Sequence, residues 1–222
     1  VGVCLEILHR LNRRSFELAH AVMHTSGQGF VMSFQAGGPH AQDRALEAVA
    51  YAYDLMSRTP AAARWEKPAG KDQLERLDKR YTVVGRGVGL VIGCSTFPTW
   101  NAYGAIFADL ACGCPVIVKP HPEAVLPLAL TVQIAREVLA EAGQDPSLVQ
   151  LAVDSEDAPI AGVLATRPEV RLVDYTGGSA FGTWLEENAR QAVVFTEKAG
   201  VNPAILHSTH DYKGLVRNLA FS

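Results

Sequence analysis

The sequence predicts an α/β protein: a Rossmann-like open parallel sheet with flanking helices and an N-terminal helical segment. Beyond Val88, short apolar runs alternate with amphipathic segments of helix length, which is typical of parallel strands joined by crossover helices. The short runs are nearly continuous in Val, Ile and Leu, as expected for strands that are covered on both faces. Before that point, the apolar residues recur with a helical period.

The composition allows a sizeable core and excludes several classes of function. The chain has 222 residues, of which 48% are hydrophobic and 19% charged, with a net charge of −3. Its 20 basic residues are scattered, so they form neither a nucleic-acid footprint nor a cationic membrane helix. Apolar runs such as residues 88–94 are too short to span a bilayer. We therefore expect a small-molecule partner, with no nucleic acid and no membrane.

The start of the sequence and its cysteines bear on how the protein is processed and in which compartment it is found. The sequence begins with Val1 and shows no leader pattern, so we interpret it as an internal piece or a remainder of a longer protein. Four cysteines in a chain of this length do not form a disulfide framework. Cys112 and Cys114 lack further residues at zinc-finger spacing. We expect reduced, buried thiols, no metal site and a cytoplasmic protein.

The N-terminal part reads as helices followed by a connector. Residues 4–23 carry an apolar stripe at helical spacing, and residues 42–56 carry a second one. Residues 58–70 are rich in Ala and Pro and read as a connector. Charges dominate residues 73–80, and residues 81–84 read as a short strand.

The remaining elements alternate strand and helix. The predicted strands are residues 90–94, 115–119, 149–153, 172–175 and 193–196, with a further short run at 203–206. The predicted helices between them are residues 100–111, 124–142, 158–166 and 179–188. We divide the chain into residues 1–70, the N-terminal helical segment and connector, and residues 71–222, a Rossmann-like domain.

Residues that directly follow strands are the candidates for chemistry, because open α/β sheets bind ligands beyond the carboxyl ends of their strands. Lys119 could donate to ribose hydroxyls or a phosphate, although a solvated strand-end lysine would look the same. Glu197 could be a general base or a paired surface carboxylate. A glycine-rich turn could hold a pyrophosphate at a helix start or could be a plain βα turn. The turn residues concerned are Gly177, Gly178, Ser179 and Gly182.

Four segments taken in order resemble motifs of the aldehyde dehydrogenase family. They are the strand and turn at residues 87–98, "ACGCPVIVKP" at 111–120, "YTGGSAFG" at 175–182 and "EKAGVNPA" at 197–204. The resemblance covers essentially the whole chain at consistent spacing. The wording "TFPTWN", "VKPHP" and "FTEKAGVN" is similar to the phenylacetic acid degradation (PaaN-type) branch.

The resemblance implies roles for these residues. Lys119, with His121 beside it, would bind the adenosine ribose of NADP or NAD, and the turn from Gly177 to Gly182 would hold the pyrophosphate. Glu197 would activate water for thioester hydrolysis, after a cysteine thiolate has attacked the aldehyde and hydride has passed to the nicotinamide. The implied function is NAD(P)-dependent oxidation of an aldehyde to an acid in phenylacetate or aromatic-compound degradation.

Two departures from the family pattern change the expected chemistry. Thr96 stands where the family has an oxyanion-stabilising Asn, and loss of such a donor can cost about 3 kcal/mol in the transition state. Pro122 stands where the family carries a ribose-binding carboxylate, and Glu123 is one step beyond. A carboxylate there repels a 2′-phosphate, so its displacement favours NADP over NAD.

The nucleophilic cysteine is the third departure. The resemblance implies a "GQxC"-like segment downstream of Glu197, after a helix like residues 215–221. None of Cys4, Cys94, Cys112 and Cys114 fits, and Cys94 reads as a structural thiol at a strand exit. We therefore expect that residues 71–222 are an incomplete dinucleotide-binding domain, that the catalytic domain lies outside this sequence, and that residues 1–222 alone do not oxidise aldehydes.

Two alternatives to an aldehyde dehydrogenase stay open. One is a non-catalytic dinucleotide-binding module, and the other is a CoA-acylating aldehyde reductase in which Glu197 would matter less. The protein is also expected to form a homo-oligomer through the missing or adjoining regions.

Overall fold

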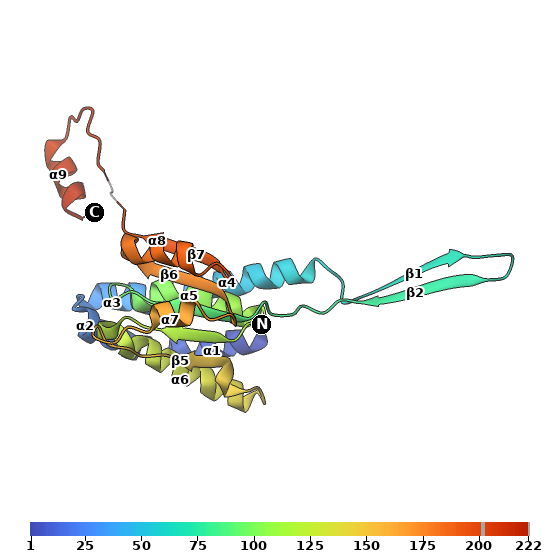
Figure 1. The fold of residues 1–222 in the computed structure, drawn as a ribbon. Coiled ribbons are helices and arrows are strands. Elements are labelled where there is room, and N and C mark those ends of the chain that lie inside the picture. Colours follow the sequence, from blue (N-terminus) through green and yellow to red (C-terminus); the bar gives the residue numbers. More distant parts are fainter. Residues whose placement is uncertain (201–202, 222) are drawn as a thin grey trace.

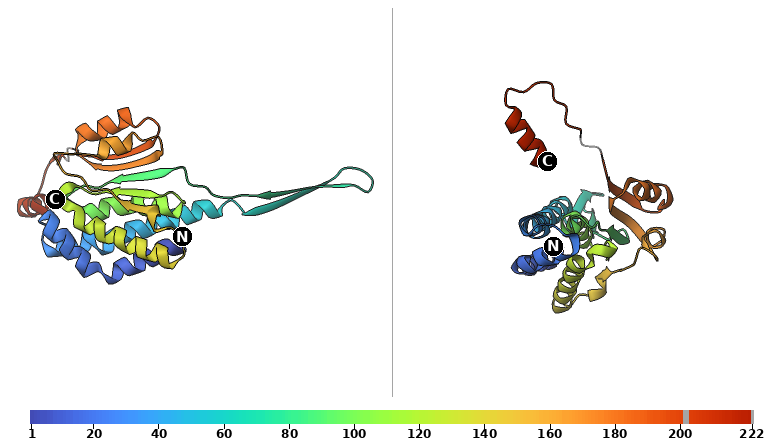
Figure 2. Two further views of the ribbon diagram at one scale, coloured as in Figure 1. Left: turned by 60° about the horizontal axis from the view of Figure 1, so that its bottom comes forward. Right: turned by 90° about the vertical axis from the view of Figure 1, so that its left-hand side faces the viewer.

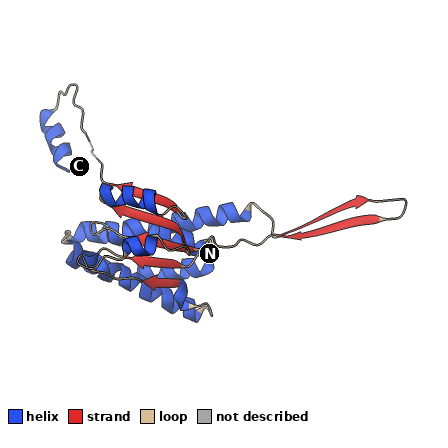
Figure 3. Cartoon of the chain, in the orientation of Figure 1, coloured by secondary structure: helices blue, strands red, loops and turns tan. Residues whose placement is uncertain are grey.

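A five-stranded parallel sheet forms the centre of the protein, in a computed structural model that describes residues 1–200 and 203–221. Helices cover both faces of this sheet, so the fold is a three-layer α/β arrangement (Figure 3). The strands in spatial order are β5 (Val149–Leu151), β4 (Val116–Lys119), β3 (Val88–Ile92), β6 (Val170–Gly177) and β7 (Val193–Lys198). The predicted fold class is confirmed, and each of the five strands predicted between residues 90 and 196 overlaps one of these.

The order of the strands contains one reversal. The chain runs outward from β3 to β4 and β5, then returns to add β6 on the other side of β3, followed by β7. Register places Ile92 beside both Lys119 and Tyr175, so β3 and β4 end at the same level and β6 continues two residues further to Gly177. A crevice opens where the direction of winding reverses, and ligands of such sheets bind there.

The larger helical layer packs α5 (Pro98–Ala111) and α6 (Val125–Glu141) on one face of the sheet. Tyr103 and Phe107 are fully buried in this layer, with edge-to-face rings 5.7 Å apart. Burial raises the pKa of Tyr103 above its usual range, and its hydroxyl is 2.7 Å from Thr131 Oγ1. The opposite face carries α7 (Ala161–Ala165) and α8 (Ser179–Asn188), around Leu90, Val173 and Leu185.

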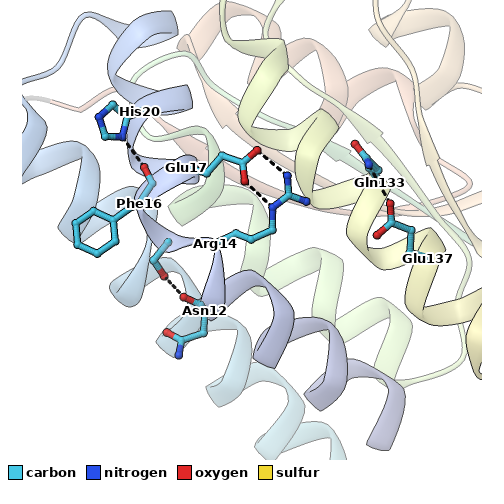
Figure 4. Close-up of polar contacts among 8 residues, drawn as sticks. Asn12, Arg14, Phe16, Glu17, His20, Gln133 and Glu137 are labelled. Carbon is cyan, nitrogen blue, oxygen red and sulfur yellow. Dashed lines mark hydrogen bonds and ion pairs between the residues drawn. The ribbon is translucent and has the colours of Figure 1, made fainter.

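The N-terminal helices extend the larger layer, but they are more numerous than predicted. The expected single helix over residues 4–23 is two helices, α1 (Gly2–Arg13) and α2 (Ser15–Ser26). Arg14 breaks the helix with φ −107° and ψ 20°, and its guanidinium pairs with Glu17 at 2.5 Å (Figure 4). Ser15 Oγ donates to the carbonyl of Asn12 at 2.8 Å, which holds the break.

A short helix that the sequence did not predict, α3 (Phe30–Gly37), packs on α2. Gly37 allows this approach, because a Cβ there would come within 2.8 Å of a Val22 methyl. Next, α4 (Pro39–Ser57) confirms the helix expected over residues 42–56. Buried residues of α1 and α4 belong to the same core as those of α5 and α6.

A projecting hairpin corrects the prediction for residues 58–84. Where a connector was expected, β1 (Ala62–Pro68) pairs antiparallel with β2 (Leu74–Arg80), whereas residues 81–84 form no strand. The hairpin extends away from the sheet (Figures 1 and 2). All its residues are exposed, and cross-strand ion pairs such as Arg64 with Asp78 at 2.6 Å connect the strands. With no buried face, these strands lack the apolar alternation that reveals a strand.

The C-terminal part also differs from prediction in detail. Residues 203–206 form no strand, whereas α9 (Tyr212–Phe221) matches the helix expected near residues 215–221 and stands apart from the sheet (Figures 1 and 2). None of the described helices is both long and apolar enough to cross a membrane. The division between residues 70 and 71 remains a proposal, and in the structure it falls in the hairpin turn.

Candidate active site

A pocket of about 950 Å³ opens at the carboxyl ends of β3, β4, β5 and β6. Its volume is at the upper end of the range typical of small-molecule and cofactor sites. The segments that follow the four strands form its walls, and α7 and α8 flank one side. It thus lies at the reversal of strand order, where the topology predicts a ligand.

Lys119 lies in the wall of this pocket and is buried, with 6% of its surface exposed. Its Nζ is 2.6 Å from Oδ1 of Asp154, a residue that follows β5. The contact is an ion pair by distance, yet no aligned hydrogen bond reaches Oδ1. The other carboxylate oxygen accepts the Ile160 N–H at 3.1 Å. The alternative of a solvated strand-end lysine is therefore wrong, because a buried ammonium is tolerated only when it is paired.

The glycine turn faces the pocket with two of its four predicted residues. Gly177 and Gly178 line the pocket, and Gly178 precedes α8 without a side-chain cap. Uncapped N–H groups at a helix start can bind an anion. Ser179 instead donates its hydroxyl to the carbonyl of Ala199 at 3.1 Å. Gly182 packs under Lys198, where a Cβ would come within 2.7 Å of the lysine stem.

The turn after β4 also matches the sequence argument in part. His121 and Pro122 line the pocket, whereas Glu123 is exposed and is not part of the lining. His121 Nδ1 accepts the Glu123 N–H at 3.3 Å. This contact leaves the proton of a neutral imidazole on Nε2.

An apolar wall between α7 and α8 completes the pocket. The rings of Phe181 and Trp184 are stacked, with centroids 5.6 Å apart and planes within 7°. Gly162 lets the indole approach, because a Cβ there would lie 3.1 Å from it. A flat ring system can pack against such a wall.

Glu197 lies on β7 at the same edge of the sheet and is exposed. Its Oε2 accepts a hydrogen bond from Asn101 Nδ2 at 3.2 Å, and Asn101 Oδ1 is 3.5 Å from the Cys94 thiol. Thr96 is exposed, and its hydroxyl is 3.6 Å from Cys94 Sγ. Among the described residues, Asn101 and not Thr96 donates to Glu197.

Two further carboxyl groups are mostly buried on the α5 side of the sheet. Burial, with a smaller effect of Asp174, raises the pKa of Asp109 to about 7. The pKa of Asp174 is raised to about 6, mainly by burial and in smaller part by Glu197, while Arg44 opposes the rise. Asp109 occupies the space that Gly89 leaves, because a Cβ at that glycine would meet the carboxylate. Neither group lines the pocket.

A sequence profile of the aldehyde dehydrogenase family matches residues 5–222. The chain belongs to the aldehyde dehydrogenase family. The match confirms the resemblance at the level of the family.

Similar proteins agree with this membership. A crystal structure of an NAD-dependent aldehyde dehydrogenase from Burkholderia multivorans is 62% identical with a TM-score of 0.94, over 99% of this chain and 40% of that one. Alpha-ketoglutaric semialdehyde dehydrogenase 2 of Azospirillum brasilense is 35% identical over 60% of this chain and 26% of its own length. A glyceraldehyde-3-phosphate dehydrogenase of Methanocaldococcus jannaschii, 17% identical, shares the fold with a TM-score of 0.69, over 90% of this chain and 41% of that one.

Sequence reasoning missed Asp154 and Asn101 in this aldehyde dehydrogenase chain. Asp154 lies three residues beyond the end of β5 and directly after the predicted strand over residues 149–153, so its position after a strand was an available signal. Asn101 lies one turn into α5, where only the three-dimensional contact with Glu197 distinguishes it from other helix residues. All four cysteines are free, and among residues 1–200 and 203–221 no three His, Cys, Asp or Glu side chains are placed to hold a metal.

Proposed function

We propose that the protein containing this chain is an NAD(P)-dependent aldehyde oxidoreductase that forms an acid, and that this chain supplies the cofactor site and the general base. One observation carries the proposal: Lys119, Gly177 and Gly178 line one pocket, and the Cys94–Asn101 contact connects its wall to Glu197. The matched family and the Burkholderia multivorans structure support it.

The residues present fit a nicotinamide dinucleotide. The buried Lys119 ammonium has donors for ribose hydroxyls, and the amides at the start of α8 suit a pyrophosphate. The Phe181–Trp184 wall suits the adenine ring. When bound, the nicotinamide of such a cofactor accepts the hydride that leaves the aldehyde carbon. We assign His121 to the same ribose region, and Ser179 and Gly182 to support of the turn.

Glu197 is the group placed to take a proton from water. Its Oε2 is held by Asn101, and the residue is exposed, so the carboxylate can accept a proton from water. We include Asn101 among the positioning residues because its amide orients the Glu197 carboxylate. Thr96 would add a hydroxyl donor on the β3 side, as the family motif implies for its position.

The substrate class is proposed from motif wording alone. "TFPTWN", "VKPHP" and "FTEKAGVN" are similar to the phenylacetic acid degradation (PaaN-type) branch, so we propose an aldehyde from aromatic-compound breakdown. The four free thiols are compatible with a cytoplasmic enzyme. The Asn101–Glu197 contact favours catalysis over a purely structural dinucleotide module, because it orients a carboxylate that binding alone does not need.

A homo-oligomer is part of the same proposal. The hairpin exposes about half of each of three large apolar side chains, Trp65 (51%), Leu74 (49%) and Leu77 (47%). Exposed apolar groups on a projecting segment favour contact with a second chain. Light scattering coupled to gel filtration of the full-length protein should give a mass above that of one chain, and a monomer would contradict this part.

The experiment for the function uses the full-length protein. NADH fluorescence titration should show saturable binding, and phenylacetaldehyde with NAD⁺ or NADP⁺ should give reduced cofactor and phenylacetate without added CoA. Absence of dinucleotide binding would overturn the proposal. A strict requirement for CoA would replace it by the acylating alternative.

A further inference from the structure

Asp154 is the buried acidic residue in the wall of the dinucleotide pocket. We propose that it is a specificity-determining residue that acts through Lys119 and makes this site select NAD over NADP. The inference rests on the proposed function, because it requires that the pocket binds a nicotinamide dinucleotide. This selectivity for NAD is opposite to the preference for NADP that Pro122 alone predicts.

The contact with Lys119 defines how Asp154 acts. Only 1% of the Asp154 side chain is exposed, so its carboxylate does not itself touch a ligand. Its Oδ1 lies 2.6 Å from the Lys119 ammonium and has no other partner among the described residues. The Ile160 N–H holds the second oxygen at 3.1 Å, which fixes the carboxylate on the loop after β5. Asp154 therefore positions Lys119 and offsets its charge.

The distance from the ribose site to Asp154 follows from this geometry. A ligand atom that accepts a hydrogen bond of about 2.9 Å from Lys119 Nζ lies no more than about 5.5 Å from Asp154 Oδ1. A neutral ribose hydroxyl at that point is little affected by the carboxylate. A 2′-phosphate carries close to two negative charges and is repelled, most strongly where water is excluded.

The other charges of the pocket act in the same direction. The side chains in its lining that carry a formal charge are Lys119, Asp154 and Glu156, one basic residue against two acidic ones. His121 accepts a backbone N–H on Nδ1, so the hydrogen bond is made by its uncharged form. In the turn after β4, Pro122 carries no charge and Glu123 lies outside the pocket lining. The negative charge of the pocket therefore comes from the loop after β5.

The loop contains a matched control. Asp157 is exposed and outside the pocket lining, so Asp157→Asn removes one charge from the same loop without changing the site. Asp154→Asn removes the buried charge while an amide oxygen can still accept the Ile160 N–H. Glu156→Gln removes the exposed charge of the lining and leaves the Lys119–Asp154 pair intact.

The test is fluorescence titration of full-length wild-type protein and the three variants with NADH and with NADPH. We expect wild type to bind NADH at least about tenfold more tightly than NADPH. Asp154→Asn should reduce that ratio by about tenfold, mainly through tighter NADPH binding, and Glu156→Gln by about threefold. Asp157→Asn should leave the ratio unchanged. A merely structural role of Asp154 would weaken both dinucleotides together.

The outcomes separate this inference from the function on which it rests. Wild type that prefers NADPH, or an unchanged ratio in Asp154→Asn, overturns the selectivity while the dinucleotide site stands. If Asp154→Asn does not fold, the wild-type ratio and the Glu156→Gln shift decide the matter. If wild type binds neither dinucleotide, both the proposed function and the selectivity are wrong.

Discussion

Lys119 and Glu197 both lie at the carboxyl edge of the sheet, yet the chain surrounds them differently. Lys119 is 6% exposed, paired with a side chain from another loop and part of a pocket. Glu197 is exposed on the edge strand β7, where Phe195 is 56% exposed and a hydrogen bond from Asn101 holds the carboxylate.

Because of this difference, we expect substitutions of Lys119 and of Glu197 to affect different properties of the protein. Removing one partner of a buried pair leaves an uncompensated charge, so changes at Lys119 should affect folding as well as binding. An exposed carboxylate contributes little to stability, so changes at Glu197 should affect the reaction and leave the fold intact. Variants on the two sides test whether the chain divides in this way.

The largest expected effect is on the Glu197 side. Glu197→Gln in the full-length protein should lower kcat about 10³-fold, because an amide does not accept the proton from water. The amide oxygen can keep the contact with Asn101, so the free energy of unfolding should change by less than about 0.5 kcal/mol. Steady-state kinetics and thermal unfolding measure the two quantities. Near wild-type turnover would remove Glu197 from the mechanism.

On the Lys119 side, the main effect should be on folding. Lys119→Met should lower the free energy of unfolding by about 3 kcal/mol, because Asp154 then remains buried without a counter-charge. The double variant Lys119→Met/Asp154→Leu should recover a large part of this loss. Urea unfolding of the wild type, both single variants and the double variant measures the coupling. Additive effects would show that the ion pair is not a coupled unit.

A smaller effect tests which residue assists Glu197. Asn101→Ala should lower kcat about tenfold and leave the Kd for NADH unchanged, since it removes the hydrogen bond that orients the carboxylate. Thr96→Ala is the matched comparison, because Thr96 makes no contact with Glu197. Should Thr96→Ala reduce kcat more than Asn101→Ala does, the oxyanion role implied by the family motif outweighs the contact seen here.

The smallest expected effect is on the free energy of unfolding, and it comes from Asp109 on the α5 side of the sheet. Burial raises the pKa of Asp109 to about 7, against about 3.9 in an unfolded chain. The folded state therefore retains a proton, and the stability linked to it is present below pH ~4 and lost as pH rises through ~7. Asp109→Asn keeps a neutral side chain, so it should be more stable than wild type by about 1 kcal/mol at pH 8, with the difference shrinking toward pH 4.

Urea unfolding across that pH range measures the Asp109 effect. Asp157→Asn, at an exposed position, serves as the control and should show no such trend. A difference between Asp109→Asn and wild type that is the same at pH 4 and pH 8 would mean that the pKa of Asp109 is the same in the folded and the unfolded protein.

Local pattern determined the sheet and the helices that cover it. The apolar runs before Lys119 and Gly177 identify β4 and β6, and the helix expected over residues 179–188 has the bounds of α8. These elements have a buried face, so the period of the apolar residues records their geometry. The hairpin of β1 and β2 has no buried face, which is why it was read as a connector.

For the site, the sequence by itself determined which residues lie at or just beyond the carboxyl ends of strands, and so it identified Lys119, Gly177, Gly178 and Glu197. Only the tertiary structure decided their partners. Asn101 and Glu197 are 96 residues apart in the chain, and Asp154 reaches Lys119 from a different crossover. Neither Asn101 nor Asp154 is marked by a periodic pattern in the sequence, because a hydrogen bond or ion pair between distant segments depends on how the strands are ordered in the sheet. Strand order, and with it the charge beside Lys119, is a property of the folded chain.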